Sequence, residues 1–412
     1  MKKIKLFVVN VLIIILSTTI LSVYTNAIET ESSETITSMY EFMIKKICTN
    51  DNCLDFKTNN FKSTNYNFFN FPVDYGGAFY DNGFLNVNLT SFDNKFFYDN
   101  ILNNSYVKYH KVKLSLNDLL YIQKCLYNIN DNYIITSSIC QKNNNIDIEI
   151  TNENAIKKIK NEITSKGFDP TCLNFFITKN ASNPLSIDNE INHIFHTSLN
   201  TNSIQKYAYP GDRVYYWNGN QRGSAIATIG FNAKNNTTNQ YGYVTAEHAL
   251  WNRSALGNNE TNMASVAQCT ASKSVDACFV PFNNSNYVAS GLINNNSLYG
   301  STIYHINSSY TSNANLEGFS LTRFGKSSKI KTVVVSAYCN YTLNGGDGTI
   351  IYNALKLSSN PAEGGDSGGP IGFVKSDNSV ILAGITSSAD DQYTYAPKIS
   401  DILSALNISL VG

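Results

Sequence analysis

The sequence predicts an α+β region in its first half and an all-β fold, either a sandwich or paired barrels, in its second. Three observations support this prediction. About ten short candidate strands follow residue 207, with turn-forming residues between them. Before residue 180, helical and strand periodicities alternate. Residues 188–206 are polar and without periodicity, as expected of a linker between the two halves.

The first half contains helices and hairpins. Residues 36–47 place their apolar side chains on one helical face. Asn82-Gly83, between two apolar segments, predicts a hairpin over residues 77–89. Ser115 and Asp118 have the spacing of a capped helix start. The other expected elements are a strand over 146–150, a helix between Asn152 and Gly167, and a strand over 173–178.

The second half is interpreted as a series of strands that ends in one helix. That helix carries Ile399, Ile402, Leu403 and Leu406 on one face. The candidate strands are residues 225–231, 242–245, 264–269, 275–281, 301–306, 318–323, 331–341, 349–357, 370–374 and 380–386.

Composition excludes several classes of partner. The 412-residue chain has 31 basic and 31 acidic residues and therefore no net charge. A balanced charge argues against nucleic acid or an anionic membrane surface as the main partner. The apolar fraction of 42% is sufficient for packed cores, so the chain is not of the disordered class.

The N-terminus has the pattern of a secretory signal peptide over residues 1–27. Lys2, Lys3 and Lys5 precede an apolar run from Leu6 to about Tyr24, and the small-residue site Thr25-Asn26-Ala27 follows. The alternative is a membrane anchor, because the run approaches spanning length. We expect cleavage after Ala27, an extracellular product and no membrane partner after signal removal.

The eight cysteines of an exported chain favour disulfides over metal binding. Nearest-neighbour pairing would join residues 48–53, 125–140 and 269–278, with Cys172 and Cys339 left over. The five histidines form no ligand motif, so no metal and no cofactor are expected.

The segment Gly364-Gly365-Asp366-Ser367-Gly368-Gly369-Pro370 is the clearest chemical signal in the sequence. A serine hydroxyl becomes a nucleophile when a base accepts its proton, and backbone N–H groups must face the oxyanion that develops. Flanking glycines allow the tight turn that brings such N–H groups together. Ser367 is therefore the candidate nucleophile.

His248 and Asp276 are the candidate partners of Ser367. His248 follows a strand in the sequence Thr245-Ala246-Glu247-His248, whereas His305 lies in the middle of a strand. Asp276 is a lone acid at the head of an apolar strand, where a buried carboxylate requires a partner such as an imidazole N–H.

In the order His248, Asp276, Ser367 these residues resemble the chymotrypsin family of serine proteases, in particular its streptogrisin and α-lytic protease branch. Further matching segments are residues 321–328, Ala362-Glu363, 384–387 and 395–397. The resemblance covers about residues 207–412. It implies a double six-stranded β-barrel with a C-terminal helix, and a protease domain at residues 201–412.

Residues 28–200 resemble the folding pro-region of that branch. Two segments carry this resemblance, the glycine-led hairpin over 75–87 and the strand–helix–strand over 145–178. The resemblance implies that this pro-region assists folding, acts as an intramolecular inhibitor and is then removed.

The resemblance also assigns roles to single residues. Gly365 and Ser367 would supply the N–H groups of the oxyanion hole. Arg323 would pair with Asp366 inside the active-site loop. The strand that grips substrate would contain Thr386, Ser387, Ser388 and Ala389.

Four departures from the family pattern concern the site. Glu247 stands beside the histidine where the family has Gly or Ala, and Ala249 and Pro361 replace cysteines. Ser388-Ala389 also replaces a Gly-Gly pair on the substrate strand. The primary pocket is expected to favour uncharged side chains, in particular large apolar or aromatic ones. The resemblance places Pro361 near the pocket base, where a preference for basic side chains would need a carboxylate, and Thr386 where glutamate-specific members have a histidine.

The sequence therefore predicts a secreted, monomeric serine endopeptidase that is made as a preproprotein and acts on polypeptides. The alternative is a non-catalytic binding or adhesive protein on a protease fold, since fold alone does not determine function. An esterase is disfavoured, because no Gly-x-Ser-x-Gly elbow occurs in a βαβ setting.

Overall fold

Most of the chain from Thr35 onward is described by the computed structural model. The described residues are 35–36, 38–47, 71–102, 104–129, 133–178, 183–184, 206–218, 221–251, 253–257, 262–283, 287–293, 302–311, 316–343 and 349–411. The expected signal peptide, nearly all of the expected linker and the 48–53 cysteine pair lie outside these residues. No helix in the described ranges has the length and apolarity to cross a membrane.

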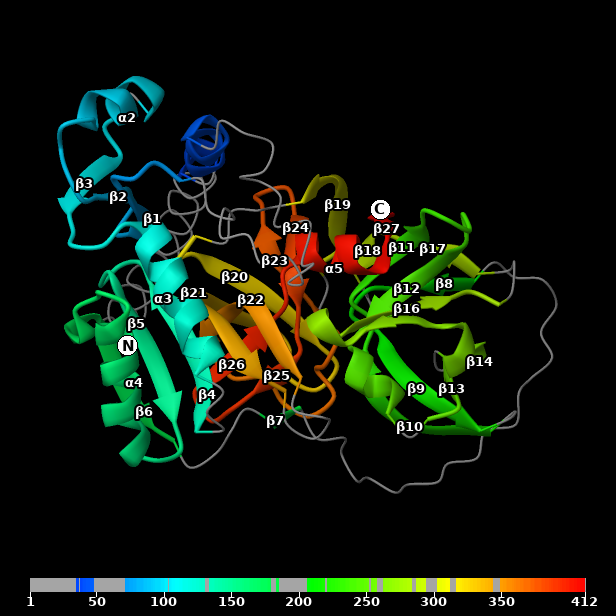
Figure 1. The fold of residues 1–412 in the computed structure, drawn as a ribbon. Coiled ribbons are helices and arrows are strands. Elements are labelled where there is room, and N and C mark those ends of the chain that lie inside the picture. The colour runs from blue at the N-terminus through cyan, green and yellow to red at the C-terminus, as the bar shows by residue number, and fades with distance from the viewer. Residues whose placement is uncertain are drawn as a thin grey trace, which may run out of the picture.

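The N-terminal region, residues 71–178 and 183–184 of the described chain, is an α+β unit (Figure 1). It contains a separate sheet of order β1-β2-β3, whereas β4, β5 and β6 pair in that order as a branch of the large sheet described below. The Asn82-Gly83 turn of the predicted hairpin has positive φ at both residues, 49° and 79°, as a tight hairpin turn requires. The predicted helix start is confirmed, because Ser115 and Asp118 form a reciprocal capping box. The elements are β1 (Tyr75–Asp81), β2 (Phe84–Leu89), α2 (Lys95–Leu102), β3 (Val107–Lys111), α3 (Leu116–Asn128), β4 (Ile134–Cys140), β5 (Asn145–Ile150), α4 (Asn154–Ser165) and β6 (Leu173–Ile177).

The first β unit of the second half encloses an apolar core between two sheets of order β10-β9-β13-β14 and β15-β16-β12-β11-β27. Its interior includes the fully buried Val214, Tyr243, Leu256 and Val280. Its strands are β8 (Lys206–Ala208), β9 (Arg213–Asn218), β10 (Gln221–Thr228), β11 (Phe231–Asn235), β12 (Tyr241–Thr245), β13 (Ala255–Gly257), β14 (Asn262–Ser265), β15 (Thr270–Ser272), β16 (Ala277–Pro281), β17 (Tyr287–Ala289) and β27 (Ile408–Leu410).

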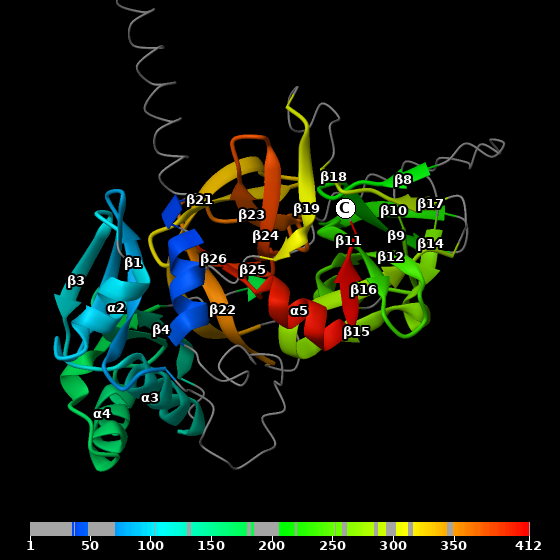
Figure 2. The same cartoon turned by 90° about the horizontal axis from the view of Figure 1, so that it is seen from above.

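The second β unit follows in the chain and lies between the first β unit and the N-terminal region (Figures 1 and 2). Its strands run in the order β18-β19-β24-β23-β20-β21-β22-β26-β25-β7. The predicted terminal helix α5 (Ile399–Leu406) packs Ile399, Ile402 and Leu406 against the core that the two units share. The strands are β18 (Leu292–Ile293), β19 (Tyr304–Thr311), β20 (Ser320–Gly325), β21 (Lys329–Thr342), β22 (Ile350–Ser358), β23 (Pro370–Val374), β24 (Ser379–Ile385), β25 (Ser388–Ala389), β26 (Tyr393–Ala396) and, from the N-terminal region, β7 (Asn183–Pro184).

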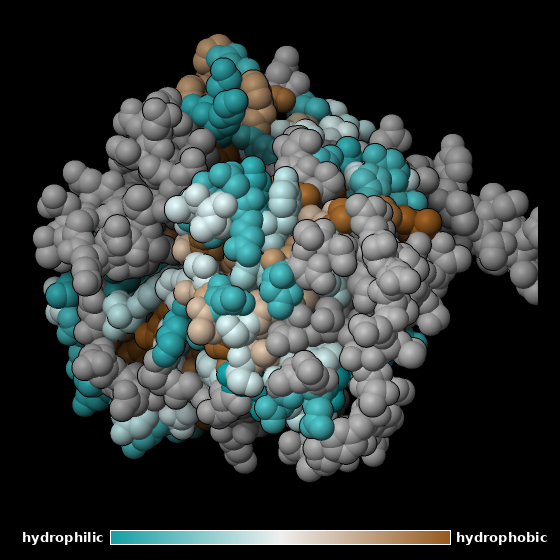
Figure 3. Space-filling view, turned by 90° about the vertical axis from the view of Figure 1, so that its right-hand side faces the viewer, coloured by the Kyte–Doolittle hydropathy of each residue, from teal (hydrophilic) through white to brown (hydrophobic). Residues whose placement is uncertain are grey.

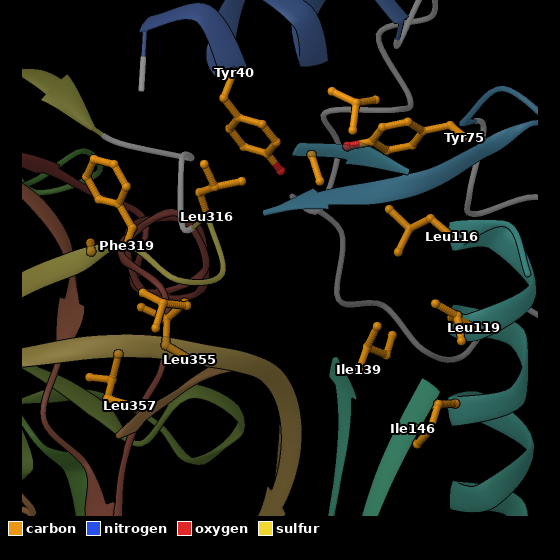
Figure 4. Close-up of a cluster of buried hydrophobic side chains, with 14 of the residues drawn as sticks. Tyr40, Tyr75, Leu116, Leu119, Ile139, Ile146, Leu316, Phe319, Leu355 and Leu357 are labelled. Atoms are coloured by element: carbon orange, nitrogen blue, oxygen red, sulfur yellow. The ribbon is translucent and has the colours of Figure 1, made fainter. Parts of the chain in front are cut away.

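A single sheet joins the N-terminal region to the second β unit. β4 pairs antiparallel with β21, with Ile139 opposite Tyr338 and Thr136 opposite Tyr341. The apolar core is also continuous across this junction, from Leu119 and Ile146 to Leu355 and Leu357 (Figure 4). The two regions therefore share one core.

The predicted fold class is confirmed, with two β units, a C-terminal helix and an α+β region before them. Strands of the N-terminal region extend the sheet of the second unit to 13 strands, and β27 adds an edge to the first unit. On the face of the molecule in Figure 3, the described surface is mostly polar and apolar colour is confined to small areas.

The predicted disulfides 125–140 and 269–278 are wrong, because all four residues are free thiols in the structure. Their sulfur atoms have other partners: the Cys140 thiol donates to Glu317 Oε1, and the Cys278 thiol donates to the carbonyl of Ala246. Cys278 lies opposite Ala271 in the β15–β16 ladder. Cys269 precedes β15 and is therefore two residues away from the position opposite Cys278. Adjacency in sequence was therefore a poor guide to pairing. Cys172 and Cys339 are also free.

Candidate active site

The loop between β22 and β23 places Ser367 at the junction of the two β units. Ser367 is fully buried, and its carbonyl accepts from the backbone N–H of Thr228 in the first unit. Gly368 has φ of 84°, and a Cβ at this position would clash with Thr245 and Thr228. Glycine is therefore required where the serine loop contacts the strand that leads to His248.

His248 and Asp276 lie beside Ser367. His248 follows β12 in a 3₁₀ turn (Glu247–Leu250), and Asp276 follows another such turn at the head of β16. The Nε2 atom of His248 is 2.8 Å from Ser367 Oγ, and its Nδ1 atom is 2.9 Å from Asp276 Oδ2. The backbone N–H of His248 donates to Asp276 Oδ1 at 3.0 Å. A base between a hydroxyl and a carboxylate is the arrangement that activates a serine.

The electrostatic surroundings favour a protonated imidazole. Burial alone would lower the pKa of His248. The charge of Asp276 and its hydrogen bond, with a smaller contribution from Glu247, together outweigh this effect, so the pKa of His248 lies above its ordinary value. Glu247 is buried, and its Oε2 accepts from Trp251 Nε1 at 3.1 Å. The Trp251 ring in turn meets the His248 ring edge-on, with centroids 5.7 Å apart. Glu247 is therefore close enough for its charge to raise the pKa of His248.

Replacing Glu247 by glutamine is expected to move the acidic limb of the pH profile of kcat/KM to lower pH. The substitution removes a negative charge that favours the imidazolium, so the pKa of His248 falls and the neutral base persists to lower pH. Asp377→Asn, in the turn between β23 and β24, is the matched control and should leave the limb in place. An acidic limb that stays unchanged or moves upward would contradict this role for Glu247.

The peptides around Gly365 are oriented by hydrogen bonds to their carbonyl groups. The carbonyl of Gly364 accepts from Ser327 Oγ at 2.6 Å, and that of Gly365 accepts from Thr228 Oγ1 at 2.8 Å. Because C=O and N–H point in opposite directions in a trans peptide, the N–H of Gly365 faces away from Ser327. Gly365 has φ of 90°, a conformation that glycine adopts without strain.

Arg323 and Asp366 face each other beneath this loop, and neither side chain is exposed. Their closest atoms, Nη2 and Oδ2, are 3.8 Å apart. Asp366 Oδ1 accepts from the backbone N–H groups of Ser327 and Ser328, and its Oδ2 accepts from that of Glu363. The carboxylate is therefore held by three backbone donors as well as by the nearby guanidinium.

The four residues of the predicted substrate strand have different partners in the structure. Ser388 and Ala389 form β25, which pairs with β26 on one side and with Pro184 and Asn183 on the other. Thr386 is buried, and its backbone N–H and C=O both bond to the serine loop.

Ser387, which was predicted to bind substrate, turns its hydroxyl inward and donates to Asp276 Oδ2. Its hydroxyl accepts from Tyr341 OH at 2.7 Å. Thr228 and Tyr341 were not identified from the sequence, since neither lies in a local motif.

Comparisons with known proteins find similarity in structure alone. No protein-family model matches the chain, and no curated protein matches it. Among solved structures, protease A of Thermobifida fusca is 21% identical, with a TM-score of 0.39, and the match covers 50% of this chain and 99% of that protein. Chymotrypsin of Cellulomonas bogoriensis is 19% identical over 50% and 99% of the two chains, with a TM-score of 0.37. A homologue of α-lytic protease, N4, is 15% identical over 50% and 100%, with a TM-score of 0.39. These serine proteases are of the kind that the sequence resembles.

Proposed function

We propose that this protein is a serine endopeptidase that hydrolyses peptide bonds through an acyl-enzyme. The observation that carries the proposal is the continuous contact from Asp276 through His248 to Ser367, with distances of 2.9 and 2.8 Å. Ser367 attacks the scissile carbonyl, and His248 accepts its proton and later donates it to the leaving amine. Asp276 holds the imidazole tautomer, and the N–H groups of Gly365 and Ser367 stabilise the oxyanion.

Labelling with a fluorophosphonate tests this proposal, because such reagents phosphonylate an activated serine. We expect one equivalent of label on Ser367 in the mature protein, located by peptide mass spectrometry, and none in Ser367→Ala. Cleavage of a peptide library by the same preparation then tests for peptidase activity. Absence of both label and cleavage would favour the alternative of a non-catalytic binding protein.

We further propose that residues 28–200 form a pro-region of a secreted precursor. Three contacts support an inhibitory role. The edge of β25, where the resemblance expects substrate to pair, is occupied by Asn183 and Pro184. β4 extends the sheet at β21. Glu149 forms a buried ion pair with Lys356, with Oε1 and Nζ 2.5 Å apart.

The separate pro-region is expected to inhibit the mature protease in trans and to accelerate its refolding. Pairing of distant strands is slow because loop closure precedes the favourable contacts, and a bound pro-region can lower that barrier. Refolding of residues 207–412 with and without the pro-region measures this effect. Equal yields and equal rates would contradict the folding role.

Glu149→Leu in the pro-region is the sharper test of inhibition. Removing one partner of a buried charge pair is expected to weaken binding by about 2 kcal/mol or more, roughly thirtyfold in the inhibition constant. Glu162→Leu, on the exposed side of α4, is the matched control. Equal inhibition by both variants would show that the Glu149–Lys356 contact does not contribute.

A further inference from the structure

The carboxylate of Asp276 is the end of a hydrogen-bond chain that enters the site from β21. Asp276 is fully buried, and its Oδ2 accepts from both His248 Nδ1 and the Ser387 hydroxyl. The oxygen of Ser387 accepts in turn from Tyr341 OH at 2.7 Å. The chain therefore runs from Tyr341 through Ser387 to Asp276 and on to His248.

The direction of this chain follows from the chemistry of its members. Burial raises the pKa of the Tyr341 phenol well above its ordinary value, so the phenol remains a donor over the working range of pH. A serine hydroxyl has one proton. While Tyr341 donates to the Ser387 oxygen, the proton of Ser387 is directed at the Asp276 carboxylate. Consecutive donors polarise one another in a dry interior, so the bond to Asp276 is strengthened.

The position of the Tyr341 hydroxyl is fixed by packing. The side chain has no exposed surface, and its ring stacks on Tyr395 with centroids 5.0 Å apart and planes at 28°. The strand itself is paired with β22, where Tyr341 lies opposite Ile351. A phenol held in this way can act as a rigid support for a neighbouring hydroxyl.

We propose that Tyr341 is a positioning residue of the catalytic site, acting on Asp276 through Ser387. The inference rests on the proposed serine protease function. In this proposal Tyr341 does not contact the substrate or the reacting atoms. Its role is to orient the Ser387 proton, and so to hold Asp276 where it can fix the His248 tautomer.

A double-mutant cycle in protein produced from the full chain tests the inference, with Tyr341→Phe, Ser387→Ala and the double variant. Tyr341→Phe should lower kcat roughly tenfold, the effect of one hydrogen bond, with KM changed less than about twofold. In the Ser387→Ala background, Tyr341→Phe should not lower kcat further, because the hydroxyl that links Tyr341 to Asp276 is absent. Tyr338→Phe removes a hydroxyl from the opposite face of the same strand and should leave kcat unchanged.

A second measurement does not require turnover. The titration of His248, followed by NMR of histidine-labelled protein, should move to higher pH in Tyr341→Phe. Without the Tyr341 hydroxyl, the hydrogen bond from Ser387 to Asp276 is weaker, so the Asp276 carboxylate stabilises the imidazolium more strongly than in the wild type. An unchanged kcat and titration in Tyr341→Phe, or equal losses in both backgrounds, would overturn the inference. If the wild-type chain neither labels nor cleaves, the protease function fails, while the titration still decides whether the hydrogen-bond chain acts on His248.

Discussion

Ser367→Ala is expected to abolish turnover and to leave the fold intact. The side chain is small and buried, and alanine fits the same loop without altering the backbone bonds of Gly368 and Gly369 to their neighbours. Loss of a serine nucleophile typically costs on the order of 10⁶ in kcat. The residual rate would come from the oxyanion site and from substrate binding alone.

The precursor provides a second result from the same variant. If maturation is autocatalytic, Ser367→Ala should accumulate as the full precursor when it is expressed alone. Ser409→Ala, at an exposed serine in β27, is the matched control and should mature normally. A mature-sized product from the pure Ser367→Ala protein would exclude self-cleavage, whereas full peptidase activity would exclude Ser367 as the nucleophile.

The sequence identifies Ser367, His248 and Asp276 as candidates because each has a strong local context. The tight turn around Ser367 requires glycines, and the strand that ends before His248 is apolar and periodic, so both features are visible in short windows. Asp276 was identifiable because an acid at the head of an apolar strand needs a partner. The structure brings these three side chains together from segments 28 and 119 residues apart.

Contacts that depend on long-range pairing could not be predicted in the same way. Tyr341 has the alternating burial of an ordinary core strand, and its contact with Ser387 spans 46 residues. Likewise, β4 has the periodicity of any amphipathic strand, and nothing in its sequence identifies β21 as its partner. Register and partner are properties of the assembled sheet.

The strand boundaries illustrate the same limit. Residues 225–231 were predicted as one strand, but the structure divides them into β10 and β11 at Ile229-Gly230. At this break Gly230 packs against the carbonyl of Gly368, where a Cβ would clash. That constraint comes from the active-site loop, more than 130 residues away in the chain. The apolar pattern of residues 225–231 alone therefore does not reveal the break between the two strands.

Arg323→Met is expected to lower the free energy of unfolding by about 3–5 kcal/mol, because it leaves the buried Asp366 carboxylate without a cation. Methionine preserves most of the volume, so the loss reports charge and hydrogen bonds. Arg323 also donates to the carbonyl groups of Asn360 and Pro361, and to the hydroxyl groups of Ser328 and Thr394. These acceptors surround the start of the loop that carries Gly365 and Ser367, so activity should fall together with stability.

Two further variants separate the charge of Arg323 from its geometry. Arg323→Lys keeps the cation but cannot supply the same planar set of donors, and it should recover only part of the stability. The double variant Arg323→Met, Asp366→Asn removes both charges, and it should be more stable than Arg323→Met alone because no uncompensated carboxylate remains.

Chemical denaturation of all four proteins measures these effects, with Arg213→Met at the exposed start of β9 as control. If Arg323→Met unfolds with the same free energy as the wild type, or if the double variant is no more stable than the single one, Arg323 does not compensate the charge of Asp366. The active-site loop would then depend on the three backbone donors to that carboxylate.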